Sequence, residues 1–386
     1  MSARRQITGA LAIGATAAIA AWLLLPLTHG ADFAQFHFHA RKWLSGGDAY
    51  SGGFPVMRAT RVVPEPFFYP FPTLLAVAPF ALLPLGVAVS AFVGVSSTLL
   101  AYAVISRCPE RLPLFLGPGF FVALVLGQWS PVVTATIIIP ALGWLCVLKP
   151  NLGLAAAASS PTKVAILGGG ALLIATLLIQ PNWPVEWLRN LHSMPPHPMP
   201  IQLPGGFLLL LALLRWRRPE ARLVVAMACV PQLMYFADQL PLWLVAKTRR
   251  EAMILSGVSA AAWVASLEPS KYTLIAVLAG IYILLGTALD GVSMIVLTTS
   301  IVIPMVEKAG FDLVWFGIFI VLLVEIAELT PPLGFNLFVL QTMSGRDSNY
   351  VAYASIPFFC LMVLCIALIT VFPWIVTWLP NAVISK

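Results

Sequence analysis

A carboxylate stands where the first long apolar segment of the chain ends. Asp32 is the first acidic residue, it follows an apolar run over Ile7–Leu27, and a polar, aromatic and basic stretch comes after it. A carboxylate at the boundary between lipid and water could take a proton from a hydroxyl group at the level of the lipid headgroups. We therefore treat Asp32 as the candidate catalytic residue, with the alternative that it only ends a helix at the water boundary.

Residues that could bind a phosphate or a polar substrate follow Asp32. The cations in this outward loop oppose the positive-inside rule, and a site for an anionic group would explain them. The alternative is that these cations merely contact lipid phosphates. The candidate binding residues are His37, His39, Arg41, Lys42, Arg58, Arg61, Tyr69, Gln128 and Asp238.

Composition places the chain in a membrane. Of its 386 residues, 60% are hydrophobic and only 10% are charged, whereas a soluble domain carries roughly a quarter charged residues. The sequence predicts an all-α, polytopic transmembrane protein with about 10–13 membrane segments, several of them too short to span alone. The bilayer is thus an expected partner.

Charge and cysteine usage narrow the class further. The net charge of +7 comes from cations in short loops, which is typical of membrane topology and not of nucleic-acid binding. This pattern predicts a bacterial inner (cytoplasmic) membrane protein with a cytoplasmic N-terminus, in which Lys149 anchors the cytoplasmic interface. The five cysteines show no metal-ligand spacing, so no metal site is expected.

Polar residues interrupt the apolar segments near the C-terminus. Thr330-Pro331-Pro332 lies inside an apolar run, and consecutive prolines break a helix. Non-helical backbone at membrane depth is tolerated where it lines a cavity. The freed carbonyl groups, together with Thr330 and Asn336, could bind a cation. Alternatively, Asp290, Glu325 and Glu328 are paired interior groups that only hold helices together.

The N-terminal part resembles glycosyltransferase family 87, integral-membrane enzymes of the GT-C class. The resemblance rests on Asp32-Phe33, Ala40-Arg41, Gly46-Gly47-Asp48-Ala49-Tyr50, Tyr69-Pro70-Phe71-Pro72, Gly127-Gln128-Trp129 and Leu148-Lys149-Pro150-Asn151. It implies a domain over residues 1–267 that moves a mannose-like hexose from a polyprenyl-phosphate donor to an acceptor on the outer membrane face. It also implies that Asp32 is the general base, that a lipid-linked sugar is the partner and that no metal or other cofactor is required.

Residues 268–386 resemble the C-terminal portion of the large membrane subunit of TRAP transporters. The motifs are Leu289-Asp290-Gly291-Val292-Ser293 and Glu325-Ile326-Ala327-Glu328-Leu329-Thr330-Pro331-Pro332-Leu333-Gly334-Phe335-Asn336. This resemblance implies sodium coupling, a small membrane subunit and a periplasmic binding protein as partners. The ion and substrate region would contain Asp290, Ser293, Thr330, Pro331, Gly334 and Asn336.

Three functions follow from these features. A hexosyltransferase is favoured, because the N-terminal part keeps its proposed catalytic loop. A sodium-coupled dicarboxylate permease of the TRAP type is the alternative. An inactive fused reading frame is the third.

Overall fold

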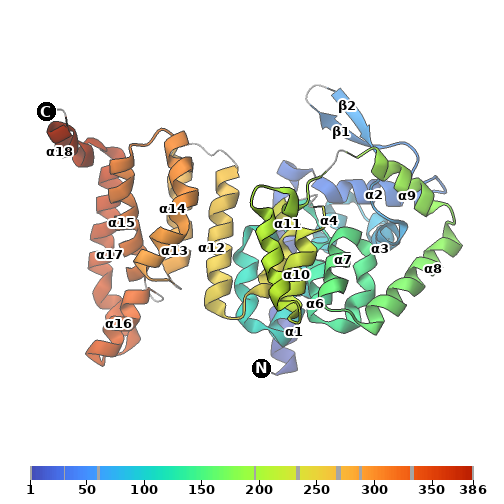
Figure 1. Cartoon of the computed structure of the whole chain (residues 1–386), viewed down its shortest axis with the longest axis horizontal. Helices are drawn as coiled ribbons and strands as arrows, with labels where there is room; N and C mark the ends of the chain where they lie inside the picture. The colour runs from blue at the N-terminus through green and yellow to red at the C-terminus, as the bar shows by residue number, and fades with distance from the viewer. Residues whose placement is uncertain are drawn as a thin grey trace. The chain divides into compact units, whose positions relative to one another are not determined.

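The computed structural model describes residues 2–29, 31–58, 61–194, 197–231, 235–266, 271–286, 289–330 and 334–384 (Figure 1). The chain forms two compact units, Met1–Lys247 and Thr248–Lys386. Each unit is described by itself.

Two long antiparallel helices, α1 (Ala3–Thr28) and α4 (Leu85–Arg107), pack along their length in the N-terminal unit. A Cβ atom at Gly14 would collide with Thr98, and one at Gly94 would lie 3.0 Å from the Cβ of Ala18. Small residues thus let the two backbones approach closely, as is common between membrane helices.

The chain between these helices forms α2 (Ala31–Leu44), β1 (Phe54–Arg58), β2 (Arg61–Glu65) and α3 (Phe71–Ala81). The strands pair antiparallel, with Phe54 opposite Glu65. This hairpin is a departure from the all-α expectation. Helix α2 is anchored by Phe33 and Phe36, which are fully buried.

Short helices make up the rest of the N-terminal unit. Proline stands in the first turn of most of them, where its missing N–H costs nothing and its ring ends the preceding helix. They are η1 (Pro109–Leu116), α5 (Pro118–Leu126), α6 (Ser130–Ile138), η2 (Pro140–Leu148), α7 (Pro150–Ser159), η3 (Val164–Gly168), α8 (Gly169–Ile179), α9 (Trp183–His192), η4 (Pro200–Gln202), η5 (Gly206–Arg215), α10 (Pro219–Ala228), α11 (Tyr235–Asp238) and η6 (Leu240–Val245).

Helix α15 forms the centre of the C-terminal unit. Its Phe319 is fully buried in an apolar core, and the indole N–H of Trp315 donates to the carbonyl oxygen of Ile369 at 2.7 Å. The unit consists of α12 (Arg249–Ser266), α13 (Lys271–Gly286), α14 (Gly291–Lys308), α15 (Leu313–Leu329), α16 (Phe335–Ser344), α17 (Ser348–Val371) and α18 (Trp374–Ile384).

The helices confirm a polytopic helical membrane protein. Within the described residues, α1, α4, α14 and α17 are long and apolar enough to cross a membrane. Two bent pairs, η1 with α5 (61°) and η3–α8 with α9 (99°), raise the count to six. The number is below the 10–13 segments expected from sequence, because prolines divide the apolar runs into short or bent helices.

Candidate functional site

Two helix interruptions meet in the C-terminal unit. One separates α13 from α14, and the other separates α15 from α16. A Cβ atom at Gly286, the last residue of α13, would lie 2.7 Å from Ala327. A Cβ atom at Gly291, the first residue of α14, would lie 2.7 Å from Oε1 of Glu328. The ends of α13, α14 and α15 therefore converge at Glu328.

Glu328 links three helices through its carboxylate. The side chain is only 7% exposed, and it accepts hydrogen bonds from the backbone N–H of Gly291 and from the side-chain amide of Asn336. Gly291 begins α14 and Asn336 lies in the first turn of α16. A carboxylate there is stabilised by the partial positive charges at both helix N-termini.

Asp290 caps the start of α14. Its carboxylate accepts the backbone N–H of Ser293 at 3.1 Å and the Ser293 hydroxyl at 2.7 Å. This is the usual way in which an aspartate satisfies the free N–H groups of a helix start. Asp290 and Ser293 therefore fix the N-terminus that Glu328 faces.

The residues on either side of the second interruption, Thr330 and Gly334, lie close together. The Thr330 hydroxyl donates to the carbonyl oxygen of Ile326 at 2.7 Å, and the Gly334 N–H donates to the carbonyl oxygen of Thr330 at 2.9 Å. A Cβ atom at Gly334 would collide with the carbonyl oxygen of Glu328, so glycine is what allows this approach. Pro331 lies outside the described residues.

The arrangement offers two kinds of binding position. The C-terminal ends of α13 and α15 present backbone carbonyl groups, which suit a cation, and the N-terminal ends of α14 and α16 suit an anion. Over the described ranges, no three His, Cys, Asp or Glu side chains group as a metal site. A hard monovalent cation such as sodium fits a donor set of carbonyl, hydroxyl and amide oxygens with few carboxylates.

The residues that the sequence analysis proposed for the ion and substrate region lie beside these two helix interruptions, apart from Pro331, which is not described. Glu328 was considered only as an interior group that holds helices together, and the structure makes it the common acceptor for α14 and α16. The signal in the sequence was its position two residues before Thr330, at the end of an apolar helix.

A second polar cluster lies in the N-terminal unit. The Gln128 amide donates to the Asp32 carboxylate. The Lys149 ammonium donates to the Gln128 side-chain oxygen at 2.8 Å and to Asp238 at 2.5 Å. Lys149 and Asp238 are fully buried, so the expectation that Lys149 anchors the cytoplasmic interface is wrong.

Burial is the main cause of the shifted pKa values of Asp32 and Tyr69 in this cluster. Asp32 lies in the first turn of α2, outside the candidate membrane spans. Burial raises the pKa of Asp32 to about 6, although Lys149 and the bond from Gln128 act in the opposite direction. Burial also raises the pKa of Tyr69 well above its usual value, and Asp32 and Asp238 add to the effect. The structure thus brings together Asp32, Tyr69, Gln128 and Asp238.

The basic candidates do not join this cluster. His37, Arg41 and Lys42 line a separate open cavity of about 760 Å³ that Asp32 does not line. His39 is buried and bonds through Nδ1 to the carbonyl oxygen of Ala49 at 2.8 Å.

The remaining two cations lie in the hairpin. Arg58 and Arg61 face each other across the turn between β1 and β2, and their side chains lie outside the described part of the structure. The phosphate-binding group expected around Asp32 is therefore not assembled by the described residues.

Paired helix interruptions inside a membrane unit are typical of secondary transporters. Residues 207–375 match the family model of the DctM component of the tripartite ATP-independent periplasmic (TRAP) transporters. Residues 207–375 are thus similar to the permease component of TRAP transporters, and the helices make the chain a multi-pass membrane protein.

Curated relatives agree with the family match. The sialic acid TRAP transporter permease protein SiaT of Haemophilus influenzae is 30% identical over 115 residues, 30% of this chain and 19% of that protein. The C4-dicarboxylate TRAP transporter large permease protein DctM of Vibrio cholerae is 32% identical over 96 residues, 25% of this chain and 21% of that protein. DctM of Pseudomonas aeruginosa is 28% identical over 123 residues, 32% of this chain and 29% of that protein. The chain thus spans less than a third of the length of these relatives.

These similarities correct the enzymatic interpretation. The hexosyltransferase expected from the N-terminal motifs is wrong: the matched family and these relatives are transporter components. The family match begins at Phe207, inside the range 1–267 that was assigned to a glycosyltransferase domain. A lipid-linked sugar partner and a general-base role for Asp32 lose their support with it.

Proposed function

We propose that the C-terminal part of this chain is the ion- and substrate-binding part of a TRAP-type secondary transporter. The observation that carries the proposal is the convergence of two helix interruptions on Glu328. Its carboxylate joins the N-termini of α14 and α16 through Gly291 and Asn336. An arrangement that only held helices together would not need two broken helices at one place.

Sodium is the proposed coupling ion. It would be held by oxygen atoms at the two interruptions, including those of Asp290, Ser293, Thr330 and Asn336. Backbone carbonyl groups at broken helices are the usual sodium ligands in such transporters.

The proposed substrate is a small organic carboxylate. The names of the relatives mention sialic acid and C4-dicarboxylates, both of which carry carboxylate groups. Helix N-termini bind such groups through their free N–H groups and partial positive charge. Because Glu328 already faces two N-termini, an incoming anion would meet a like charge. A sodium ion beside Glu328 would offset that charge, which gives a physical reason for coupling.

Transport would require further chains. A small membrane subunit and a periplasmic binding protein are the proposed partners. The proposed orientation places the N-terminus in the cytoplasm, because basic residues concentrate in the loops of that side.

The test is uptake of radiolabelled C4-dicarboxylate and sialic acid by cells without other TRAP carriers. The cells express the full chain with its partner subunits. We expect uptake of one substrate that depends on sodium and falls at least about tenfold in Asn336→Ala, since a lost bond to a charged group costs about 1.5–3 kcal/mol. Thr342→Ala, an exposed position on the same helix, is the control and keeps uptake. Uptake that ignores sodium, or no uptake of either substrate, contradicts the proposal.

A further inference from the structure

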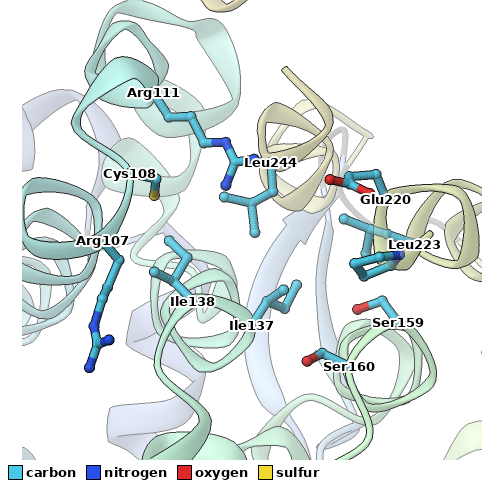
Figure 2. A pocket seen from close by; sticks show the side chains of 11 residues that line it. Arg107, Cys108, Arg111, Ile137, Ile138, Ser159, Ser160, Glu220, Leu223 and Leu244 are labelled. Atoms are coloured by element: carbon cyan, nitrogen blue, oxygen red, sulfur yellow. The ribbon is translucent and has the colours of Figure 1, made fainter. Parts of the chain in front are cut away.

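A cavity of about 280 Å³ lies in the N-terminal unit, apart from the two polar clusters described above (Figure 2). Arg107, the last residue of the membrane span α4, stands at its edge. Since α4 is 23 residues long and apolar, its end lies at the level of the lipid headgroups. The cavity is therefore placed where a headgroup can enter it.

One wall of this cavity is cationic. Figure 2 shows the Arg111 guanidinium reaching toward the middle, whereas the Arg107 side chain points away from it. Arg111 is held in place by its Nε, which donates to the carbonyl oxygen of Ala246 at 2.8 Å. This bond leaves the terminal nitrogens of the fork in a fixed direction, which favours phosphate oxygens.

The opposite wall carries a carboxylate and hydroxyl groups. Glu220, Ser159 and Ser160 stand across the cavity from Arg111 (Figure 2). Arg222, two residues after Glu220 on α10, donates to the carbonyl oxygen of Ser159 at 2.7 and 3.1 Å. These bonds fix α10 against the end of α7, so the position of the Glu220 wall is set by the fold.

A cationic wall facing a carboxylate selects a ligand with both charges. We propose that this cavity binds the phosphoethanolamine headgroup of a membrane lipid, with its phosphate on Arg111 and its ammonium on Glu220. The apolar lining side chains, such as Leu223 and Leu244, suit the glycerol end of the same molecule. A lipid with a phosphate but no ammonium would leave Glu220 facing a negative group. The site is independent of transport by the C-terminal unit.

The lipids that the purified full chain retains test whether Glu220 binds the ammonium group of a headgroup. The protein is purified in detergent, given equal amounts of phosphatidylethanolamine and phosphatidylglycerol, and examined by native mass spectrometry. We expect the wild type to retain phosphatidylethanolamine in preference. Glu220→Gln should lose that preference by about tenfold, because one charge-assisted contact is removed. Arg111→Gln should lose both lipids.

Matched variants separate a site from general charge effects. Arg217→Gln and Glu186→Gln each remove one charge outside the cavity lining, and both should behave as wild type. Arg111→Gln also removes the bond to Ala246, so it can weaken folding. The Glu220→Gln result does not depend on that bond. The proposal is overturned if the wild type retains the two lipids equally, or if Glu220→Gln keeps the same preference for phosphatidylethanolamine as the wild type.

A second measurement identifies the source of the phosphate. We compare the thermal midpoint of the full chain with short-chain phosphatidylethanolamine and with soluble O-phosphoethanolamine at the same concentration. A lipid site predicts stabilisation by the former and a much smaller shift with the latter. Equal shifts from the two compounds overturn the assignment to a lipid.

Discussion

Replacing Gly291 with alanine tests the contact that holds the two helix interruptions together. Gly291 begins α14 and lies against α15, so that a Cβ atom would be 2.6 Å from Cγ1 of Val324 and 2.7 Å from Oε1 of Glu328. Neither distance is tolerated by non-bonded atoms. The Glu328 carboxylate would have to withdraw, which breaks its hydrogen bond with the Gly291 N–H.

The cost can be worked out from these contacts. Overpacking a core position costs about 1–3 kcal/mol, and a lost hydrogen bond to a charged group costs about 1.5–3 kcal/mol. Alanine regains about 0.5–1 kcal/mol over glycine through lower backbone entropy in the unfolded chain. We expect Gly291→Ala to lower the free energy of unfolding of the C-terminal unit by about 2–5 kcal/mol.

Two other glycines provide matched controls. Gly280 in α13 and Gly317 in α15 have open space where a Cβ atom would be added. Their alanine variants should be neutral or more stable by up to about 1 kcal/mol. The four proteins are unfolded in detergent and followed by tryptophan fluorescence. If Gly291→Ala has the same free energy of unfolding as Gly317→Ala, the close approach of α14 to Glu328 is refuted.

Three further outcomes are expected. Asp238→Asn leaves the buried Lys149 ammonium without its charged partner and should destabilise the N-terminal unit by about 3–5 kcal/mol. Adding Lys149→Met should restore much of this loss. If chemical denaturation shows that the double variant loses the sum of the two single losses, the Lys149–Asp238 ion pair is contradicted. Because the folded pKa of Asp32 is raised to about 6, the folded state binds this proton more tightly than the unfolded state. Stability should therefore fall as pH rises from about 4 to 6, and thermal midpoints of Asp32→Asn should lack this fall. Trp315→Phe removes the donor to the Ile369 carbonyl and should cost about 1–3 kcal/mol in thermal unfolding, with an unchanged midpoint as the contrary result.

Composition and helix-breaking residues predicted much of the C-terminal unit. Prolines at 331 and 332 and the polar residues Asp290 and Asn336 are strong local signals, because each is costly inside an apolar helix. The prolines located the interruption between α15 and α16. The partner of Asn336 was not predicted, since the sequence does not show that Glu328 on α15 faces the first turn of α16.

In the N-terminal unit, the sequence motifs predicted which residues come together but not the buried lysine that joins them. Asp32, Gln128 and Asp238 were chosen for their resemblance to an enzyme family, and the structure does bring them together. They meet through Lys149, which was assigned to the membrane surface because most lysines stay in contact with water. A pairing between residues about 90 positions apart leaves no periodic signal in the sequence.

Sodium binding to the purified chain tests the central claim most directly. Binding of ²²Na⁺ is measured by a scintillation proximity assay on the wild type, Asn336→Ala and the control Thr342→Ala. The account predicts saturable binding by wild type and control, and at least about tenfold weaker binding by Asn336→Ala. Equal binding by all three proteins, or none by the wild type, would contradict a cation site at the two helix interruptions.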